Sequence, residues 1–183
     1  MIDKLYVISE ILKSEAEKMS DLSSEYKSDI FIRCVYDVKK LDSSKKYCIC
    51  EEKTDSIIKL KKDVAAIYIF YSDTKILFDD VFDSVKYGAK SNKEEPNSKD
   101  VGVFYLGKTF DVATRLRDHF GDEDKTPYSL KYNHISRIDK FQPAKLYVFQ
   151  LSEGYTEYRN LILSTIESRL HEICCPAIGS KRV

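Results

Sequence analysis

The sequence predicts an α+β fold in which a small mixed or antiparallel sheet is flanked by helices. Two observations support this prediction. Short β-branched and aromatic runs, typical of strands, are followed by segments with apolar residues at helical spacing. In addition, strands and helices do not alternate regularly and the sequence has no glycine-rich nucleotide-binding fingerprint. A doubly wound nucleotide-binding domain is therefore not expected.

Residues 1–62 are expected to form an N-terminal extension made of a helix and strands. The runs Ile30–Val35 and Tyr47–Cys50 have strand composition and are separated by a polar turn. This extension could add strands to the sheet, select a target or mediate dimerisation, and the sequence leaves these roles open. The helix is predicted from apolar residues at helical spacing: Ile2, Leu5, Ile8, Ile11 and Leu12.

Residues 63–183 are expected to form the second domain, which starts with a buried strand. The continuous apolar run Val64–Tyr71 predicts this strand. After a polar loop over Tyr87–Asp100, the segment Gly102–Leu106 predicts another strand, which ends in Gly107–Thr109. A third strand is expected over Lys145–Leu151. These strands would form the sheet of the domain.

Two helices are expected beside these strands. Phe110–Phe120 has apolar residues four apart and is followed by Gly121, which predicts a short amphipathic helix. Glu157–Cys175 is the longest helical pattern and stops at Pro176. The helices would cover the sheet and complete the core.

The composition is that of an ordinary soluble protein, with 43% hydrophobic and 33% charged residues. No apolar run is long enough to cross a bilayer and no signal peptide is visible, so the expected compartment is the cytoplasm, without membrane partners. Five cysteines, an odd number that includes a vicinal pair, suit reduced thiols. Cys48 and Cys50 are interpreted as core residues because no further ligands for zinc stand at the required spacing.

The formal net charge is zero, which argues mildly against a protein that coats DNA without specificity. Charge is nevertheless uneven. Between Lys125 and Lys145 the chain has five basic residues, among them Lys131 and Arg137, and the single acid Asp139. Considered alone, this positive strip is more simply a solvated loop face.

Several residues could take part in chemistry. Gly107 lies where a strand meets a helix, between Tyr105 and Lys108, and a glycine there allows a turn or a close approach. Arg115 and His119 are four residues apart and share one helix face, an arrangement that suits a phosphate group. Taken singly, each of these features is more often a plain turn, a surface arginine or a packed histidine.

Glu167 and Tyr68 lie within apolar segments. Glu167 is on or beside the apolar stripe of the last helix, where a carboxylate must be ion-paired, solvated in a cleft or bound to a cation. Tyr68 is in the first predicted strand of the second domain, and a buried tyrosine usually packs and finds one hydrogen-bond partner.

Together, and in their order along the chain, these features resemble the GIY-YIG nuclease family. Ala66–Tyr68 is similar to the first motif and Tyr105–Gly107 to the second. Arg115 then matches the family arginine, and Glu167 the glutamate of a helix that runs towards a proline. His119 stands where related enzymes have a tyrosine or a histidine. The chain differs from the pattern at Ala66, at Gly179, where an asparagine is frequent, and in the long insertion between the two motifs.

The resemblance implies a metal-dependent endonuclease that hydrolyses nucleic-acid phosphodiesters, with DNA the favoured substrate. Glu167 would bind one Mg²⁺ or Mn²⁺, and Arg115 would neutralise charge on the phosphoryl oxygens. Tyr68, helped by His119 or a water molecule, would accept a proton; which of the two is the base stays open. Tyr105 and Lys108 would position the phosphate. Lys131 and Arg137, in the positive strip, would hold the nucleic-acid backbone.

Two other hypotheses remain at this point. The fold could be a catalytically silent module that binds nucleic acid or a protein partner, which the neutral charge and the departures from the motifs favour. Alternatively, the chain could be an unrelated α+β interaction protein with chance motifs. A homodimer is compatible with all three, and the choice between DNA and RNA and the biological context are undetermined by the sequence.

Overall fold

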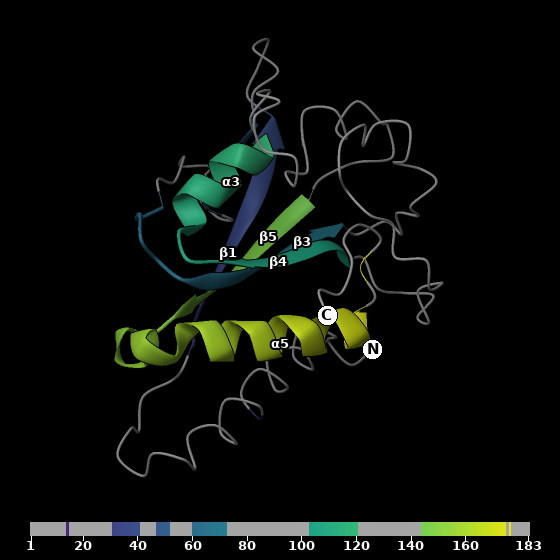
Figure 1. The fold of residues 1–183 in the computed structure, drawn as a ribbon. Coiled ribbons are helices and arrows are strands. Elements are labelled where there is room, and N and C mark those ends of the chain that lie inside the picture. The colour runs from purple at the N-terminus through teal and green to yellow at the C-terminus, as the bar shows by residue number, and fades with distance from the viewer. Residues whose placement is uncertain are drawn as a thin grey trace.

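The computed structural model describes residues 14, 31–40, 47–51, 60–72, 103–120, 144–174 and 176 (Figure 1). Three predictions therefore concern residues outside the described part. The first is the helix over the first residues of the chain, of which only Ser14 is described. The second is the loop Tyr87–Asp100. The third is the positive strip, of which only the last residues are described. Lys131 and Arg137 also lie outside it.

The centre of the fold is a five-stranded sheet with the order β2-β1-β5-β3-β4. All of its pairings are antiparallel, so the described chain has an α+β fold, as predicted. The strands from the N-terminal extension pair into this sheet through β5, which means that the described part of residues 1–62 adds strands to it. The bounds are β1 Phe31–Lys40, β2 Tyr47–Glu51, β3 Ala66–Ser72, β4 Val103–Thr109 and β5 Ala144–Leu151.

Strand β3 is buried on both faces, as its continuous apolar run predicts. Every residue from Ala66 to Phe70 has 0% exposure. Because side chains alternate along a strand, Ile67 and Ile69 point to one face of the sheet, and Tyr68 and Phe70 to the other. The phenol of Tyr68 is thus the polar group at the centre of an otherwise apolar strand.

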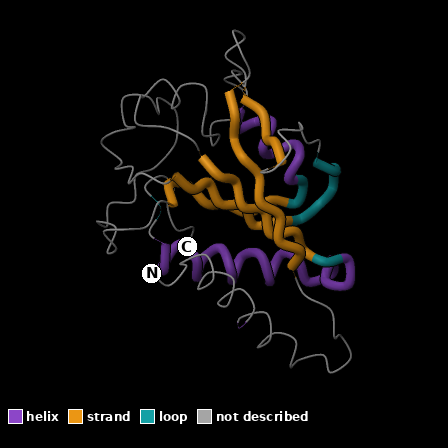
Figure 2. The backbone as a smooth tube through the Cα atoms, turned by 180° about the vertical axis from the view of Figure 1, so that it is seen from behind, coloured by secondary structure: helices purple, strands orange, loops and turns teal. Residues whose placement is uncertain are grey.

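Helices cover the two faces of this sheet (Figures 1 and 2). Helix α3, Val112–Phe120, lies on the face of Tyr68 and Phe70, with Phe70 and Phe120 in an edge-to-face ring contact. Helix α5, Arg159–Cys174, lies on the opposite face and follows a 3₁₀ turn, η2, at Glu153–Tyr158. Its buried residues join Ile67, Ile69 and Leu106 in the main core: Ile162, Leu163, Ile166, Leu170 and Cys174.

Some boundaries differ from the predicted ones for identifiable reasons. Strand β4 does not end at Leu106, because its pairing with β3 continues through Gly107 to Thr109. Gly107–Thr109 is therefore strand, so of the two alternatives predicted at Gly107, a turn or a close approach, the turn does not occur there. Helix α3 begins two residues later than predicted because Asp111 is its N-cap: Oδ1 accepts a hydrogen bond from the Thr114 amide at 3.0 Å.

The described part of the chain has two α-helices of more than one residue, α3 and α5. Neither of them is long and apolar enough to span a bilayer.

Candidate functional site

Four of the predicted site residues meet where α3 packs on β3 and β4. The hydroxyl of Tyr68 is 2.8 Å from Nε2 of His119, and Nε of Arg115 donates to the same hydroxyl at 3.2 Å. The ring of Tyr105 lies 6.1 Å from that of Tyr68 and 5.1 Å from that of His119. Residues from β3, β4 and α3 thus form one group, which we call the tyrosine–histidine cluster: Tyr68, Tyr105, Arg115 and His119.

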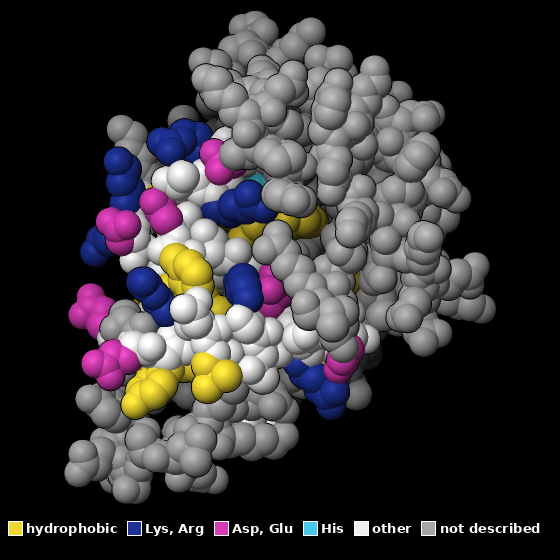
Figure 3. Space-filling view, in the orientation of Figure 1, with side chains coloured by type: hydrophobic (Ala, Val, Ile, Leu, Met, Phe, Trp, Pro, Cys, Tyr) yellow, Lys and Arg dark blue, Asp and Glu magenta, His cyan; other side chains and the backbone are white. Residues whose placement is uncertain are grey.

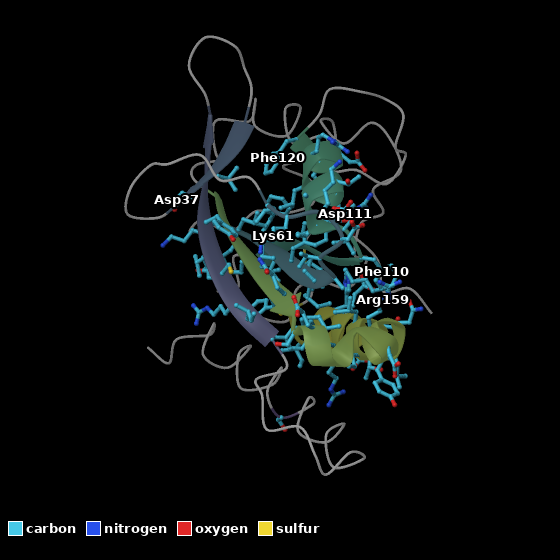
Figure 4. All side chains as sticks on the ribbon, turned by 90° about the vertical axis from the view of Figure 1, so that its left-hand side faces the viewer. Asp37, Lys61, Phe110, Asp111, Phe120 and Arg159 are labelled. Atoms are coloured by element: carbon cyan, nitrogen blue, oxygen red, sulfur yellow. The ribbon has the colours of Figure 1, made fainter. Side chains whose placement is uncertain are left out.

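Local structure at the start of α3 orients this cluster. The Val112 amide donates to the Val64 carbonyl at 3.1 Å, which ties the first turn of α3 to the residue two before β3. Asp111 caps the helix, and Figure 4 shows it at the N-terminal end of α3. Because Arg115 and His119 are one turn apart, fixing the helix directs both side chains towards the sheet.

Gly107 makes room for the hydroxyl of Tyr68. The two residues are directly paired across β3 and β4. A Cβ atom on Gly107 would lie 2.7 Å from the Tyr68 hydroxyl oxygen and 3.0 Å from the ring carbon Cζ. The sequence analysis allowed a close approach of substrate at this glycine, whereas in the fold the group that approaches is the neighbouring Tyr68 side chain.

Gly107→Ala should lower the stability of the protein, because the new methyl group overlaps Tyr68. We expect a cost of about 1–3 kcal/mol in the free energy of unfolding, the usual range for overpacking. Chemical denaturation measures it. In a Tyr68→Phe background the cost should be smaller, since the nearest atom is gone. An equal cost in both backgrounds would show that the overlap with the hydroxyl is not the cause.

Burial determines the protonation of the cluster. Tyr68 and His119 are both 0% exposed. Burial raises the pKa of Tyr68 well above 10.0, and the Arg115 guanidinium opposes this increase without cancelling it. Burial also lowers the pKa of His119 well below 6.5, as does the positive charge of Arg115. At neutral pH the pair is therefore a neutral phenol and a neutral imidazole.

These protonation states define the hydrogen bonds. A guanidinium only donates, so the Tyr68 oxygen accepts from Arg115. With the imidazole hydrogen on Nδ1, the phenol proton of Tyr68 is donated to Nε2 of His119; the other tautomer reverses that bond. Phe70 adds to the burial of this imidazole, with its ring 5.9 Å away.

The buried imidazole of His119 should make stability depend on pH. Its pKa is lower in the folded chain than in the unfolded chain, so the unfolded state binds more protons as the pH falls below about 6.5. The contribution of the neutral His119 imidazole to the free energy of unfolding is fully present above that pH. It is lost in acid, by at most about 1.4 kcal/mol per pH unit. Between about pH 7 and pH 5, the free energy of unfolding should fall less steeply with decreasing pH in His119→Gln than in the wild type, as measured by chemical denaturation at each pH. The same slope in both proteins would refute this.

Glu167 reaches strand β4 from the other helix. Its Oε1 accepts a hydrogen bond from the Lys108 amide at 3.2 Å, and its Oε2 lies 3.4 Å from Nζ of Lys108. The Lys108 ammonium also donates to Oγ of Ser164 at 2.5 Å. Lys108 directly follows Gly107, over which the Tyr68 hydroxyl lies, so Glu167 and the tyrosine–histidine cluster contact adjacent residues of β4.

Sequence reasoning missed three residues at or beside the site, which are Phe70, Ser164 and His171. Phe70 and Ser164 have no chemical signal in the sequence, because their positions depend on packing between distant segments. His171 is buried on α5, one turn after Glu167. Burial lowers its pKa, and the Glu167 carboxylate acts in the opposite direction. Its spacing from Glu167, the same as that between Arg115 and His119, is a signal that could have identified it.

The described surface around the site is mixed in charge. Figure 3 shows Lys and Arg side chains next to Asp and Glu, without a uniformly basic area in the described part of this face. At the start of α5, Arg159 lies over the ring of Phe110 at 5.1 Å, and Figure 4 shows the two close together. Phe110 is 39% exposed, so an aromatic ring reaches the surface directly after β4.

At this site the side chain that could bind a divalent cation is the carboxylate of Glu167. Within the described part of the chain, no three His, Cys, Asp or Glu side chains are gathered to hold a metal ion. Mg²⁺ often takes only one or two carboxylates and completes its shell with water and substrate phosphate. The Glu167 carboxylate, 14% exposed, fits this requirement if the Lys108 ammonium moves away from Oε2.

The fold and site define an α+β protein in which a partly buried arginine contacts a buried tyrosine–histidine pair and a carboxylate lies on the adjacent part of β4. Comparisons of the chain with protein-family models, with curated proteins and with solved structures found no match.

Proposed function

We propose that the protein is a divalent-metal-dependent endonuclease of the GIY-YIG type that hydrolyses phosphodiester bonds, with DNA as its substrate. One observation supports this most strongly. The tyrosine–histidine cluster and Glu167, drawn from segments far apart in the sequence and from helices on opposite faces of the sheet, contact the adjacent residues Gly107 and Lys108 of β4. A phosphodiester hydrolase needs a cation for the phosphate, a proton acceptor and a metal-binding carboxylate, and these residues supply all three.

Arg115 is the residue that would neutralise the phosphate. Its guanidinium has five N–H donors, and Nε uses one of them on Tyr68. As charge builds on the phosphoryl oxygens during attack by water, a guanidinium held in place stabilises it without reorganisation. The hydrogen bond to Tyr68 therefore fixes the position of a group whose charge acts on the substrate.

Tyr68 and His119 would move the proton. Because burial keeps Tyr68 a neutral phenol, it does not act as a preformed phenolate. Instead, its oxygen would accept the proton of the attacking water while its own proton passes to Nε2 of His119, 2.8 Å away, a step that requires the buried hydroxyl to become accessible when substrate binds. This relay gives the two residues one joint role. Tyr105 completes the aromatic surroundings that hold the imidazole.

Glu167 would hold the Mg²⁺ or Mn²⁺ ion, which supplies Lewis-acid polarisation of the phosphate and stabilises the leaving oxygen. Lys108, whose ammonium lies 3.4 Å from Glu167, would turn to a substrate phosphate when the cation binds. Lys131 and Arg137 are proposed to hold the backbone of the nucleic acid further away.

The test is incubation of the purified full chain with supercoiled plasmid and Mg²⁺ or Mn²⁺. We expect nicking or linearisation that EDTA prevents. Single-stranded DNA and RNA substrates of matched length should be included, because they separate the substrate class from the activity. Intact nucleic acid under every metal condition would contradict the proposal.

A second function is favoured by one specific observation. The Glu167 carboxylate already has a cationic partner in Lys108, which is the arrangement of a structural ion pair. This supports a catalytically silent module that binds nucleic acid or a protein. Such a module would bind an oligonucleotide in a mobility-shift experiment and leave it uncut.

A further inference from the structure

The imidazole of His171 is a polar group that the proposed reaction does not use. His171 is 6% exposed on α5, and its Nδ1 has no hydrogen-bond partner in the described part of the chain. Buried polar atoms are nearly always satisfied, because an unsatisfied one keeps its full desolvation cost. An orphaned nitrogen at this depth therefore indicates a missing partner.

The charged group on the same helix that acts on the His171 imidazole is the Glu167 carboxylate. Residues four apart on an α-helix lie one above the other, with their side chains on one face. Both side chains are largely shielded from water, Glu167 at 14% exposure. A carboxylate and an imidazole at this spacing can bind one ion from the same helix face, as in helical zinc sites that use two side chains four apart.

We propose that Glu167 and His171 together are the protein ligands of one divalent transition-metal ion on α5. Water molecules and a substrate phosphate would complete its coordination. The role of this ion in cleavage rests on the proposed function, but its binding does not. The site deepens that function by naming the class of metal, and it gives the orphaned imidazole nitrogen a partner.

The ligand pair predicts a preference among metals. Mg²⁺ takes oxygen ligands, whereas an imidazole nitrogen adds affinity for transition ions, least for Mn²⁺ and more for Co²⁺ and Zn²⁺. His171 should therefore add affinity for these transition ions and little for Mg²⁺. The Lys108 ammonium occupies the side of Glu167 at 3.4 Å from Oε2, so it competes with any cation that binds there.

The first test reads out metal binding without cleavage. The full chain is titrated with Mn²⁺ and followed by electron paramagnetic resonance. We expect His171→Leu to weaken Mn²⁺ binding by about 10- to 100-fold, a loss at least as large as that from removing an outer-shell partner of a metal ligand, and to change Mg²⁺ binding far less. Lys108→Met should strengthen Mn²⁺ binding. The matched control is Glu172→Gln, an exposed carboxylate next to His171, which should bind Mn²⁺ like the wild type.

A second measurement works on the unmodified protein and so does not depend on a variant that folds. The chain has three histidines, and their imidazole ¹⁵N signals can be assigned individually. Addition of Zn²⁺ should shift the His171 signal and leave that of His119 in place. Unchanged Mn²⁺ affinity in His171→Leu, or an unshifted His171 signal at saturating Zn²⁺, would overturn the proposal.

The outcomes also separate this inference from the proposed function. Metal binding that needs Glu167 and His171, in a protein that cuts no nucleic acid, would support the site and refute the nuclease. If cleavage needs Glu167 but the metal affinity stays the same when His171 is replaced, the nuclease is supported and the two-ligand site is refuted.

Discussion

Glu167→Gln should abolish metal-dependent cleavage and leave the fold intact. The change keeps the size of the side chain and an oxygen that can accept the hydrogen bond from the Lys108 amide, but it removes the negative charge that a cation needs. We expect the rate of plasmid nicking to fall by at least about 100- to 1,000-fold, the scale seen when one charge-stabilising group is lost. Initial rates of nicking measure this directly.

The loss can be separated from unfolding. Lys108 loses its ionic partner in this variant, and because the two side chains are only 24% and 14% exposed, we expect a cost of about 1–3 kcal/mol in the free energy of unfolding. Circular dichroism and thermal unfolding check this. Glu172→Gln is the matched control on the same helix, because Glu172 pairs with Arg169 at the surface. A Glu167→Gln protein that cuts at the wild-type rate would refute the assignment of this residue.

Arg115→Ala should have an effect of similar size for a different reason. It removes the guanidinium that would neutralise the phosphoryl oxygens and also deletes the donor to the Tyr68 hydroxyl. The pKa of Tyr68 should then rise further, because Arg115 lowers it in the native protein. We expect a loss of about 100- to 1,000-fold in cleavage, measured as single-turnover rates with saturating enzyme.

Arg117 provides the control on the same helix. It is exposed and donates to Thr114 Oγ1, away from the tyrosine–histidine cluster. Arg117→Ala should retain the wild-type rate within a few-fold, as expected for an exposed residue outside the site. Arg115→Lys separates charge from geometry, since lysine keeps the charge and loses the fork of donors. Full activity in Arg115→Ala would exclude the proposed role of the residue.

The ion pair between Lys108 and Glu167 links the two proposed functions. In a working nuclease this pair is a resting state, and Lys108 leaves when a cation and a phosphate bind. In a silent module the same pair is permanent and fastens α5 to β4. Metal titration of Lys108→Met distinguishes them, because removal of the ammonium can raise cation affinity only if Glu167 is able to take a cation.

Much of the fold could be predicted from local patterns. The apolar patterns identified β3, β5, α3 and α5, because burial imposes a period of about 2 on strands and 3.6 on helices. The ends of the strands and helices were harder to predict. Nothing local shows that β4 continues through Gly107, because that depends on its pairing with Tyr68 in another strand. The cap at Asp111 is a local signal that defines the start of α3.

The sequence by itself indicated most of the candidate site residues, although not His171, and the helix or strand that holds each of them. Tertiary structure alone decided how they act on one another: Tyr68 and His119 are excluded from solvent, Glu167 lies against Lys108, and His171 is buried beside it. The physical reason is sequence distance. The Tyr68–His119 contact spans 51 positions and the Lys108–Glu167 hydrogen bond 59, so both depend on strand register and helix docking. Desolvation, which determines the pKa of each buried group, follows from that same packing.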